Sequence, residues 1–89
     1  MPNITATDIE QAVFSIEEIR IVIRAPRSYL FQRGYDYERK AAGTTPIKGW
    51  METRLQPILE GQQAVVIDGN GQIPHGRTKI ETVRQSYAK

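Results

Sequence analysis

Apolar residues recur at helical spacing in the middle of the chain, directly after a pair of residues typical of a helix start. Thr45 can accept a hydrogen bond from a first-turn N–H, and Pro46 has no N–H that would stay unpaired there. Pro57 disfavours helical geometry at Gln56 and clashes with the preceding turn. The pattern predicts a central helix that ends near Gln56 and packs Trp50 into the core. Its apolar face consists of Ile47, Trp50, Met51 and Leu55.

A short β-branched run follows the predicted helix. Residues 64–67 read Ala-Val-Val-Ile and are bounded by Gly61 and by Asp-Gly-Asn-Gly at 68–71. Such a run predicts a strand, and its continuous apolar character suggests that both of its faces are covered. The tandem Asp-Gly and Asn-Gly tolerate positive φ, so the chain is expected to reverse there. Gln72-Ile73 is a candidate return strand, which Pro74 limits to a couple of residues or to an edge.

Residues 15–25, which end just before Pro26, can be interpreted as a helix or as a strand. Ser15 and Glu18 have capping-box spacing, and Phe14 and Ile19 can form the hydrophobic staple of a helix over 16–25. The competing structure is a strand, because isoleucines at 19, 21 and 23 alternate with other residues. We favour the helix, since cap chemistry is more specific than intrinsic propensity. Thr7 and Glu10 have the same capping spacing and suggest a short helical turn upstream.

Three further elements are expected around the centre of the chain and at its end. Tyr29-Leu30-Phe31 reads as a strand, and the alternation at 35, 37 and 39 suits a second strand across a turn at Gly34. Near the C-terminus, Thr78 and Glu81 have capping-box spacing. Ile80, Val83 and Tyr87 then share one face of a short amphipathic helix.

These elements predict a small single α+β domain. Two or three short helices would pack on a small, mainly antiparallel sheet, with residues 1–6 as a flexible N-terminal tail and residues 7–89 as the domain. A chain of 89 residues buries a modest share of its surface, so a second subunit could supply what its core lacks.

Composition excludes several classes of protein. The chain has no cysteine, which removes disulfides and thiolate metal ligands and is compatible with the cytoplasm. No apolar run has the length of a membrane span, and the first residues lack the basic and apolar regions of a secretory signal. We therefore expect a cytoplasmic protein that does not contact a membrane.

Charge is distributed unevenly along the chain. Residues 1–18 carry four acidic residues and no Lys or Arg, whereas residues 19–54 carry eight basic residues against three acidic ones. Such asymmetry can steer association with an anionic partner. It can equally be an intramolecular match between an acidic front and a basic middle.

Basic and aromatic residues are interleaved between positions 24 and 40. Basic side chains could neutralise phosphates while exposed aromatic rings stack on bases. The competing interpretation is a solvated arginine face with half-buried tyrosines. The candidate nucleic-acid or anion-binding residues here are Arg24, Arg27, Arg33, Tyr35, Tyr37, Arg39 and Lys40.

His75 and Arg77 form a second candidate site. They precede the predicted C-terminal helix, where a helix dipole adds to their charge and could help to hold an anion. A lone histidine without cysteine does not make the usual structural zinc site. As a general base, His75 would need partners such as Asp68 or Ser86, and their spacing is not recognisable. We therefore assign no catalytic residue, no metal ligand and no cofactor.

The functional hypothesis from sequence is a small non-enzymatic binding module with a basic, aromatic-containing face. Its partner would be a macromolecule, either nucleic acid or protein. The alternative is a homo-oligomeric accessory subunit that uses apolar surface against protein, and a small hydrolase or nuclease around His75 comes third.

Overall fold

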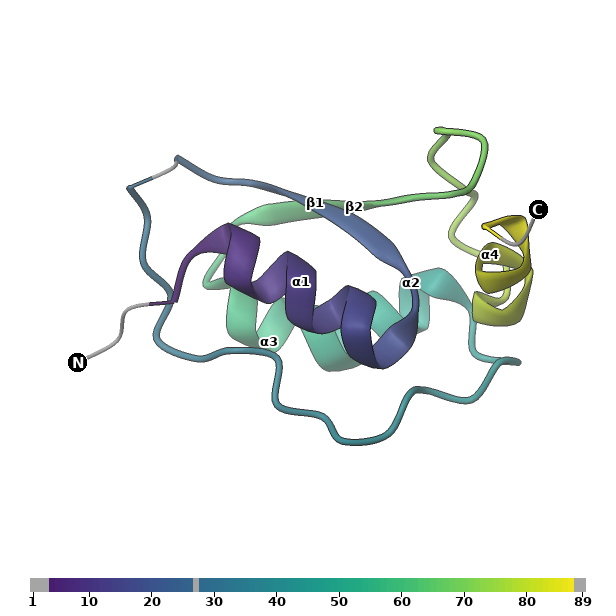
Figure 1. Ribbon diagram of the computed structural model, residues 1–89, viewed down its shortest axis with the longest axis horizontal. Coiled ribbons are helices and arrows are strands. Elements are labelled where there is room, and N and C mark those ends of the chain that lie inside the picture. Colours follow the sequence, from purple (N-terminus) through teal and green to yellow (C-terminus); the bar gives the residue numbers. More distant parts are fainter. Residues whose placement is uncertain (1–3, 27, 88–89) are drawn as a thin grey trace.

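The computed structural model describes residues 4–26 and 28–87, and within them a two-stranded antiparallel sheet is covered by helices (Figure 1). In chain order the elements are α1 (Ala6–Glu17), β1 (Arg20–Arg24), α2 (Ile47–Trp50), the π-helix η1 (Met51–Leu55), α3 (Gln56–Leu59), β2 (Gln63–Ile67) and α4 (Ile80–Ser86). The segments α2, η1 and α3 follow one another without a break and are called the central helix below. In Figure 1, α1 and the central helix lie below the strands and α4 lies at one end. The predicted small α+β fold is confirmed.

α1 begins earlier in the chain than the favoured prediction placed a helix. The Thr5 hydroxyl accepts a hydrogen bond from the Asp8 N–H (3.1 Å), and the Asp8 carboxylate accepts one from the Thr5 N–H (3.0 Å). This capping box starts the helix, which ends where Glu18 adopts left-handed geometry (φ 60°). Ile4 pairs with Phe31 in an isolated bridge, and α1 begins at Ala6, within the segment that was predicted as a tail. Residues 1–3 of that tail lie outside the described residues.

The predicted helix over 16–25 is wrong, because half of this segment, Arg20–Arg24, is the strand β1 and only its first two residues are helical, as the end of α1. Ile21 and Ile23 are buried, whereas Arg20, Val22 and Arg24 are exposed. This alternation buries one side of a pleated strand, which a helix over the same residues could not do. The caps predicted at Ser15 and Glu18 do not form there, because those positions belong to the last turn of α1 and its C-cap.

β2 confirms the predicted strand, but the strand that pairs with it, β1, lies about forty residues earlier in the sequence. Val22 pairs with Val65 and Arg20 with Ile67, so β1 and not Gln72-Ile73 is the partner strand. The turn after β2 reverses the chain as expected, with the Asp68 N–H bonded to the Gln72 carbonyl. At the end of the sheet, the Tyr87 hydroxyl accepts from the Arg20 N–H (3.0 Å) and donates to the Ile67 carbonyl. It thereby bridges the two strands.

The central helix continues past Pro57, where the sequence predicted its end. Its N-cap is Pro46 rather than Thr45, and no side chain caps it. η1 ends at Leu55, and Pro57 lies in the first turn of α3, a position that tolerates a residue without an N–H. The helix ends at Leu59, before Glu60 and Gly61 take positive φ values of 54° and 86°.

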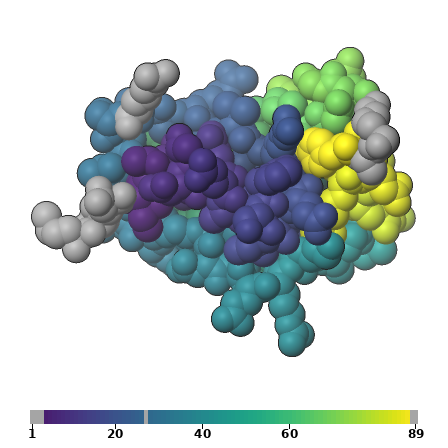
Figure 2. Space-filling view, viewed as in Figure 1, coloured from purple at the N-terminus to yellow at the C-terminus, as the bar shows by residue number. Residues whose placement is uncertain are grey.

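Trp50 and Leu55 lie in the core as predicted, with exposures of 1% and 0%. They pack in one cluster with Ile9, Ile19, Phe31, Val66, Ile80 and Val83. Among the described residues, the two strands predicted between 29 and 39 are absent apart from the bridge at Phe31. That segment instead runs without regular secondary structure around the left end and along the lower side of the molecule in the view of Figures 1 and 2.

The C-terminal helix is confirmed as α4, although its N-cap is Lys79 and no side chain caps it. It is tied to the start of the central helix, because the Ile80 N–H donates to the Thr45 carbonyl (2.9 Å). Each helix of the described residues is too short or too polar to cross a bilayer.

Candidate docking site

The predicted aromatic partners of the basic segment lie in different environments. Tyr35 is buried (4% exposed), where its hydroxyl donates to Glu17 and accepts from the Trp50 indole (3.1 Å). Tyr37 is 38% exposed, and the Arg54 guanidinium lies over its ring at 4.2 Å from the centroid. Tyr35 therefore offers no ring face to a stacking base, and one side of Tyr37 is already covered.

The predicted basic residues differ in their surroundings. Lys40 is bound in an ion pair with Glu18 (2.8 Å). Arg24, Arg33 and Arg39 are exposed, and Arg27 lies outside the described residues. His75 and Arg77 belong to the loop between β2 and α4, at the opposite end of the molecule from the turn that follows β1 (Figure 1). The loop that holds His75 and Arg77 is therefore separate from the turn that follows Arg24.

His75 is hydrogen-bonded within its own loop. Its Nδ1 accepts the Arg77 N–H at 3.1 Å, and the two groups that could have assisted it are bound elsewhere. Asp68 accepts from the Asn70 and Gln72 N–H groups, and the Ser86 hydroxyl binds the Gly69 N–H. No group of three His, Asp or Glu side chains that could hold a metal occurs in these residues.

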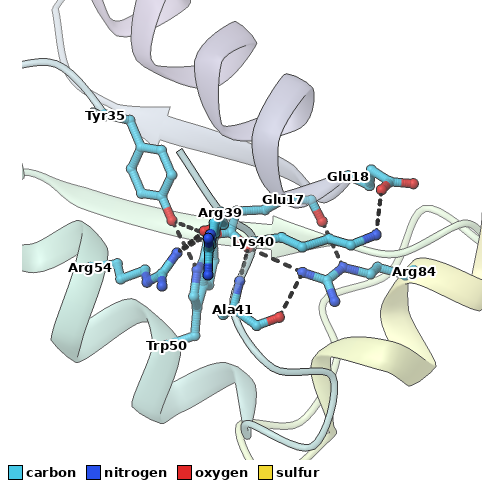
Figure 3. Close-up of polar contacts among 9 residues, drawn as sticks. All are labelled: Glu17, Glu18, Tyr35, Arg39, Lys40, Ala41, Trp50, Arg54 and Arg84. Carbon is cyan, nitrogen blue, oxygen red and sulfur yellow. Dashed lines mark hydrogen bonds and ion pairs between the residues drawn. The ribbon is translucent and has the colours of Figure 1, made fainter. Parts of the chain in front are cut away.

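The acidic front and the basic middle of the chain meet at Glu17, which the sequence did not single out (Figure 3). This carboxylate is 0% exposed and receives Arg54 at 2.7 Å and Arg84 at 3.1 Å. The Ala41 N–H (2.8 Å) and the Tyr35 hydroxyl complete its shell. Part of the charge asymmetry along the chain is thus compensated inside the molecule, by the pairs of Glu17 with Arg54 and of Glu18 with Lys40.

Glu17 remains ionised in this site. Burial alone would raise its pKa, but the hydrogen bonds from Tyr35, Ala41 and Arg54 outweigh burial and lower the pKa below its ordinary value. Burial and the bond to Glu17 raise the pKa of Tyr35. Every buried side-chain nitrogen and oxygen of the described residues has a partner. The cluster therefore joins α1, the central helix, the 39–41 segment and α4, and its carboxylate has no free acceptor site for a substrate.

The sequence did carry one signal for this cluster. Glu17 follows Ile9 and Val13 at intervals of four, on the apolar face of α1. A carboxylate at a core position requires buried cationic partners. The sequence could not name those partners, because Arg54 and Arg84 come from distant segments.

The hydrogen bonding at the outer edge of β1 shows which backbone groups of β2 point away from the sheet. At β1, the Glu10 carboxylate accepts the Ile23 N–H (2.8 Å), so this N–H points away from β2. In an antiparallel pair, opposed residues alternate between hydrogen-bonded and non-bonded pairs. Ile23 and Ile21 are therefore in non-bonded pairs with Ala64 and Val66. The backbone groups of Ala64 and Val66 consequently point out of the sheet at the other edge.

The outer edge of β2 is free over a short and well-bounded stretch. No backbone or side chain of residues 4–26 and 28–87 bonds the outward N–H and C=O groups of Ala64 and Val66. On either side the outward amides are already used, since the Gln62 N–H donates to Leu59 and the Asp68 N–H donates to Gln72. The free edge is therefore residues 64–66.

A groove runs along this edge between β2 and the central helix. Its two parts, of about 280 and 500 Å³, share Met51, Gln56, Ala64 and Val65, so they are continuous. Ile73, which is 59% exposed, lines one part. Lys48 and Glu52 are the charged residues of the lining and are opposite in sign. The groove is therefore mainly apolar and without net charge, and it lies beside unpaired backbone donors and acceptors.

Comparison of the chain with protein-family models, with curated proteins and with solved structures finds no match. The assignment of a function therefore depends on the geometry of this edge.

Proposed function

We propose that the protein is a non-enzymatic interaction module that binds an extended polypeptide segment along the free edge of β2. The observation that carries the proposal is the pair of residues Ala64 and Val66, whose outward backbone groups face an apolar groove. Strand addition satisfies such groups through main-chain hydrogen bonds, while neighbouring pockets accept alternate side chains.

The distribution of charge favours a polypeptide over a nucleic acid. Nucleic acids are held mainly by cationic groups that neutralise phosphates. Here Lys40 is paired with Glu18, and Arg54 and Arg84 are both paired with Glu17. The groove itself has no excess of positive charge. An uncharged, apolar strand matches both its lining and its backbone edge.

The test is an amide NMR titration with a capped seven-residue peptide of alternating valine and threonine. We expect the largest shift changes at the Ala64 and Val66 amides and smaller changes along the groove. Ala64→Pro should abolish them, because proline removes an outward N–H that the sheet does not use and places its ring in the groove. Ala64→Val is the matched control, since it keeps the N–H.

Two results would contradict the proposal. One is peptide-induced shifts located away from β2 and unchanged by Ala64→Pro. The other is that single- or double-stranded oligonucleotides, and not the peptide, bind at micromolar protein with an affinity that falls steeply with salt. That second result would indicate that the protein binds nucleic acid through its exposed arginines.

A further inference from the structure

We infer that the strand which occupies this edge is β2 of a second copy of the chain, so that two molecules join their sheets into one of four strands. The inference rests on the proposed function and names the partner of the same site. It follows from register, from charge and from the contrast between the two sheet edges.

Only one register uses the free groups of both copies without breaking an existing bond. A two-fold axis at Val65 places Ala64 opposite Val66 of the second copy, and each such hydrogen-bonded pair exchanges two bonds. An axis at Ala64 would need the Gln62 amide, which Leu59 holds, and an axis at Val66 would need the Asp68 amide, which Gln72 holds. The Val65-centred register leaves no outward group of residues 64–66 unpaired.

Charge opposes self-pairing at β1 and not at β2. Residues 63–67 contain no charged side chain, so two antiparallel copies bring no like charges together. In β1 the same symmetry, centred on Val22, would put Arg20 directly opposite Arg24 of the second copy, which is destabilising. Glu10 also covers the Ile23 N–H on that edge. Charged side chains and covered amides are the usual protection of an edge strand, and β2 has neither.

The joined sheet also extends an apolar stripe on its solvent face. Val22, Val65 and Ile67 share this face, because Val22 pairs with Val65 and Ile67 lies two residues further along β2. Val22 is 46% exposed in the single molecule. Across the two-fold axis, Val65 meets Val65 of the second copy in a non-bonded pair, where side chains approach most closely. Val65, at the edge of the apolar stripe in a single molecule, would lie at the centre of the four-stranded sheet.

Disulfide trapping tests the register directly, since the chain has no cysteine of its own. In the predicted pair the two Cα atoms at position 65 are about 4.5 Å apart, within the range that a disulfide spans. We expect Val65→Cys to give a covalent dimer under mild oxidation at micromolar concentration. Val22→Cys is the matched control, because it lies on the same face one strand away from the axis and should stay largely monomeric under non-reducing electrophoresis.

Sedimentation equilibrium provides the second measurement. The unmodified protein should associate reversibly, and Val65→Lys should weaken the dimer at least tenfold by placing two like charges in contact. Val22→Lys adds the same charge on the same face and should leave association nearly unchanged. A monomer at all concentrations up to several hundred micromolar, or equal trapping at positions 22 and 65, would overturn the inference.

The measurements separate this inference from the proposed function. If the protein is monomeric but the valine–threonine peptide still shifts the Ala64 and Val66 amides, the binding edge stands and the second copy is excluded as its occupant. If the protein is a dimer that Ala64→Pro and Val65→Lys leave intact, and the peptide does not bind, both proposals are overturned.

Discussion

Replacing Glu17 with alanine tests whether the buried carboxylate holds the domain together. Its oxygens accept hydrogen bonds from Tyr35, Ala41, Arg54 and Arg84. Charge-assisted bonds of this kind contribute roughly 1.5–3 kcal/mol each when taken singly. The arginine side chains are 22% and 14% exposed, so they regain some hydration when the carboxylate is lost. Both also keep bonds to backbone carbonyls.

The loss should therefore be less than the sum of four bonds. We expect Glu17→Ala to lower the free energy of unfolding by about 3–4 kcal/mol, as for other buried pairs that lose one partner. In a domain of this size each kcal/mol shifts the melting temperature by roughly 4–8 °C, so a large decrease follows. Urea unfolding followed by Trp50 fluorescence measures it, because the indole lies beside the cluster.

The matched control is Lys40→Ala, which breaks the ion pair with Glu18 at side chains that are 52% and 61% exposed. A surface pair contributes between about 0 and 1 kcal/mol, so this variant should unfold close to the unmodified protein. If Glu17→Ala and Lys40→Ala were destabilised equally, the buried cluster would not be the main tie between α1, the central helix and α4.

Two further predictions concern acid stability and the central helix. Because the folded pKa of Glu17 lies below its ordinary value of 4.5, the stability that its ionisation contributes is present above that pH and is lost as pH falls through the folded pKa. Urea midpoints taken from pH 7 down to about pH 3 should therefore fall less in Glu17→Gln than in the unmodified protein, and parallel curves would contradict the assignment. Gly49→Ala should raise the free energy of unfolding by up to about 1 kcal/mol, since a Cβ there meets no atom within 4 Å and alanine favours the helix. A decrease in the thermal midpoint of that variant would show that the space is not open.

The central helix shows what helical spacing in the sequence could and could not predict. Helical spacing placed Trp50 and Leu55 in the core, and both are buried. The stop at Pro57 was not predicted correctly, because the effect of a proline depends on the turn that precedes it. A π-helical turn over residues 51–55 lets the helix continue for one more turn, to Leu59.

The segment around residues 16–25 shows where local rules compete. Cap chemistry and β-branched alternation were both present in the sequence, and they predicted different structures. The pairing of Val22 with Val65 decides between them, since the strand gains a ladder and buries Ile21 and Ile23. Local sequence patterns cannot predict a contact between residues so far apart along the chain. The capping box that does form involves Thr5 and Asp8.

The sequence predicted the strand that forms the candidate docking edge, but not which of its two edges stays unpaired. The strand and the turn at 68–71 were predicted, yet a return strand at 72–73 would have been placed beside β2. Instead β1 pairs with one side of β2, Glu10 binds the Ile23 N–H at the outer edge of β1, and the outward groups of Ala64 and Val66 stay open. Which edge of a strand remains free depends on the whole topology.

By itself the sequence determined the fold class, the apolar faces of the central helix and α4, the strand at 64–67 and the turn after it, because each depends on neighbours within a few residues. Only the tertiary structure decided that β1 is a strand, that Arg54 and Arg84 converge on Glu17, and that Tyr35 is buried. The physical reason is that hydrogen-bonded strand pairs and buried ion pairs gain their free energy from groups that meet only after the chain has folded.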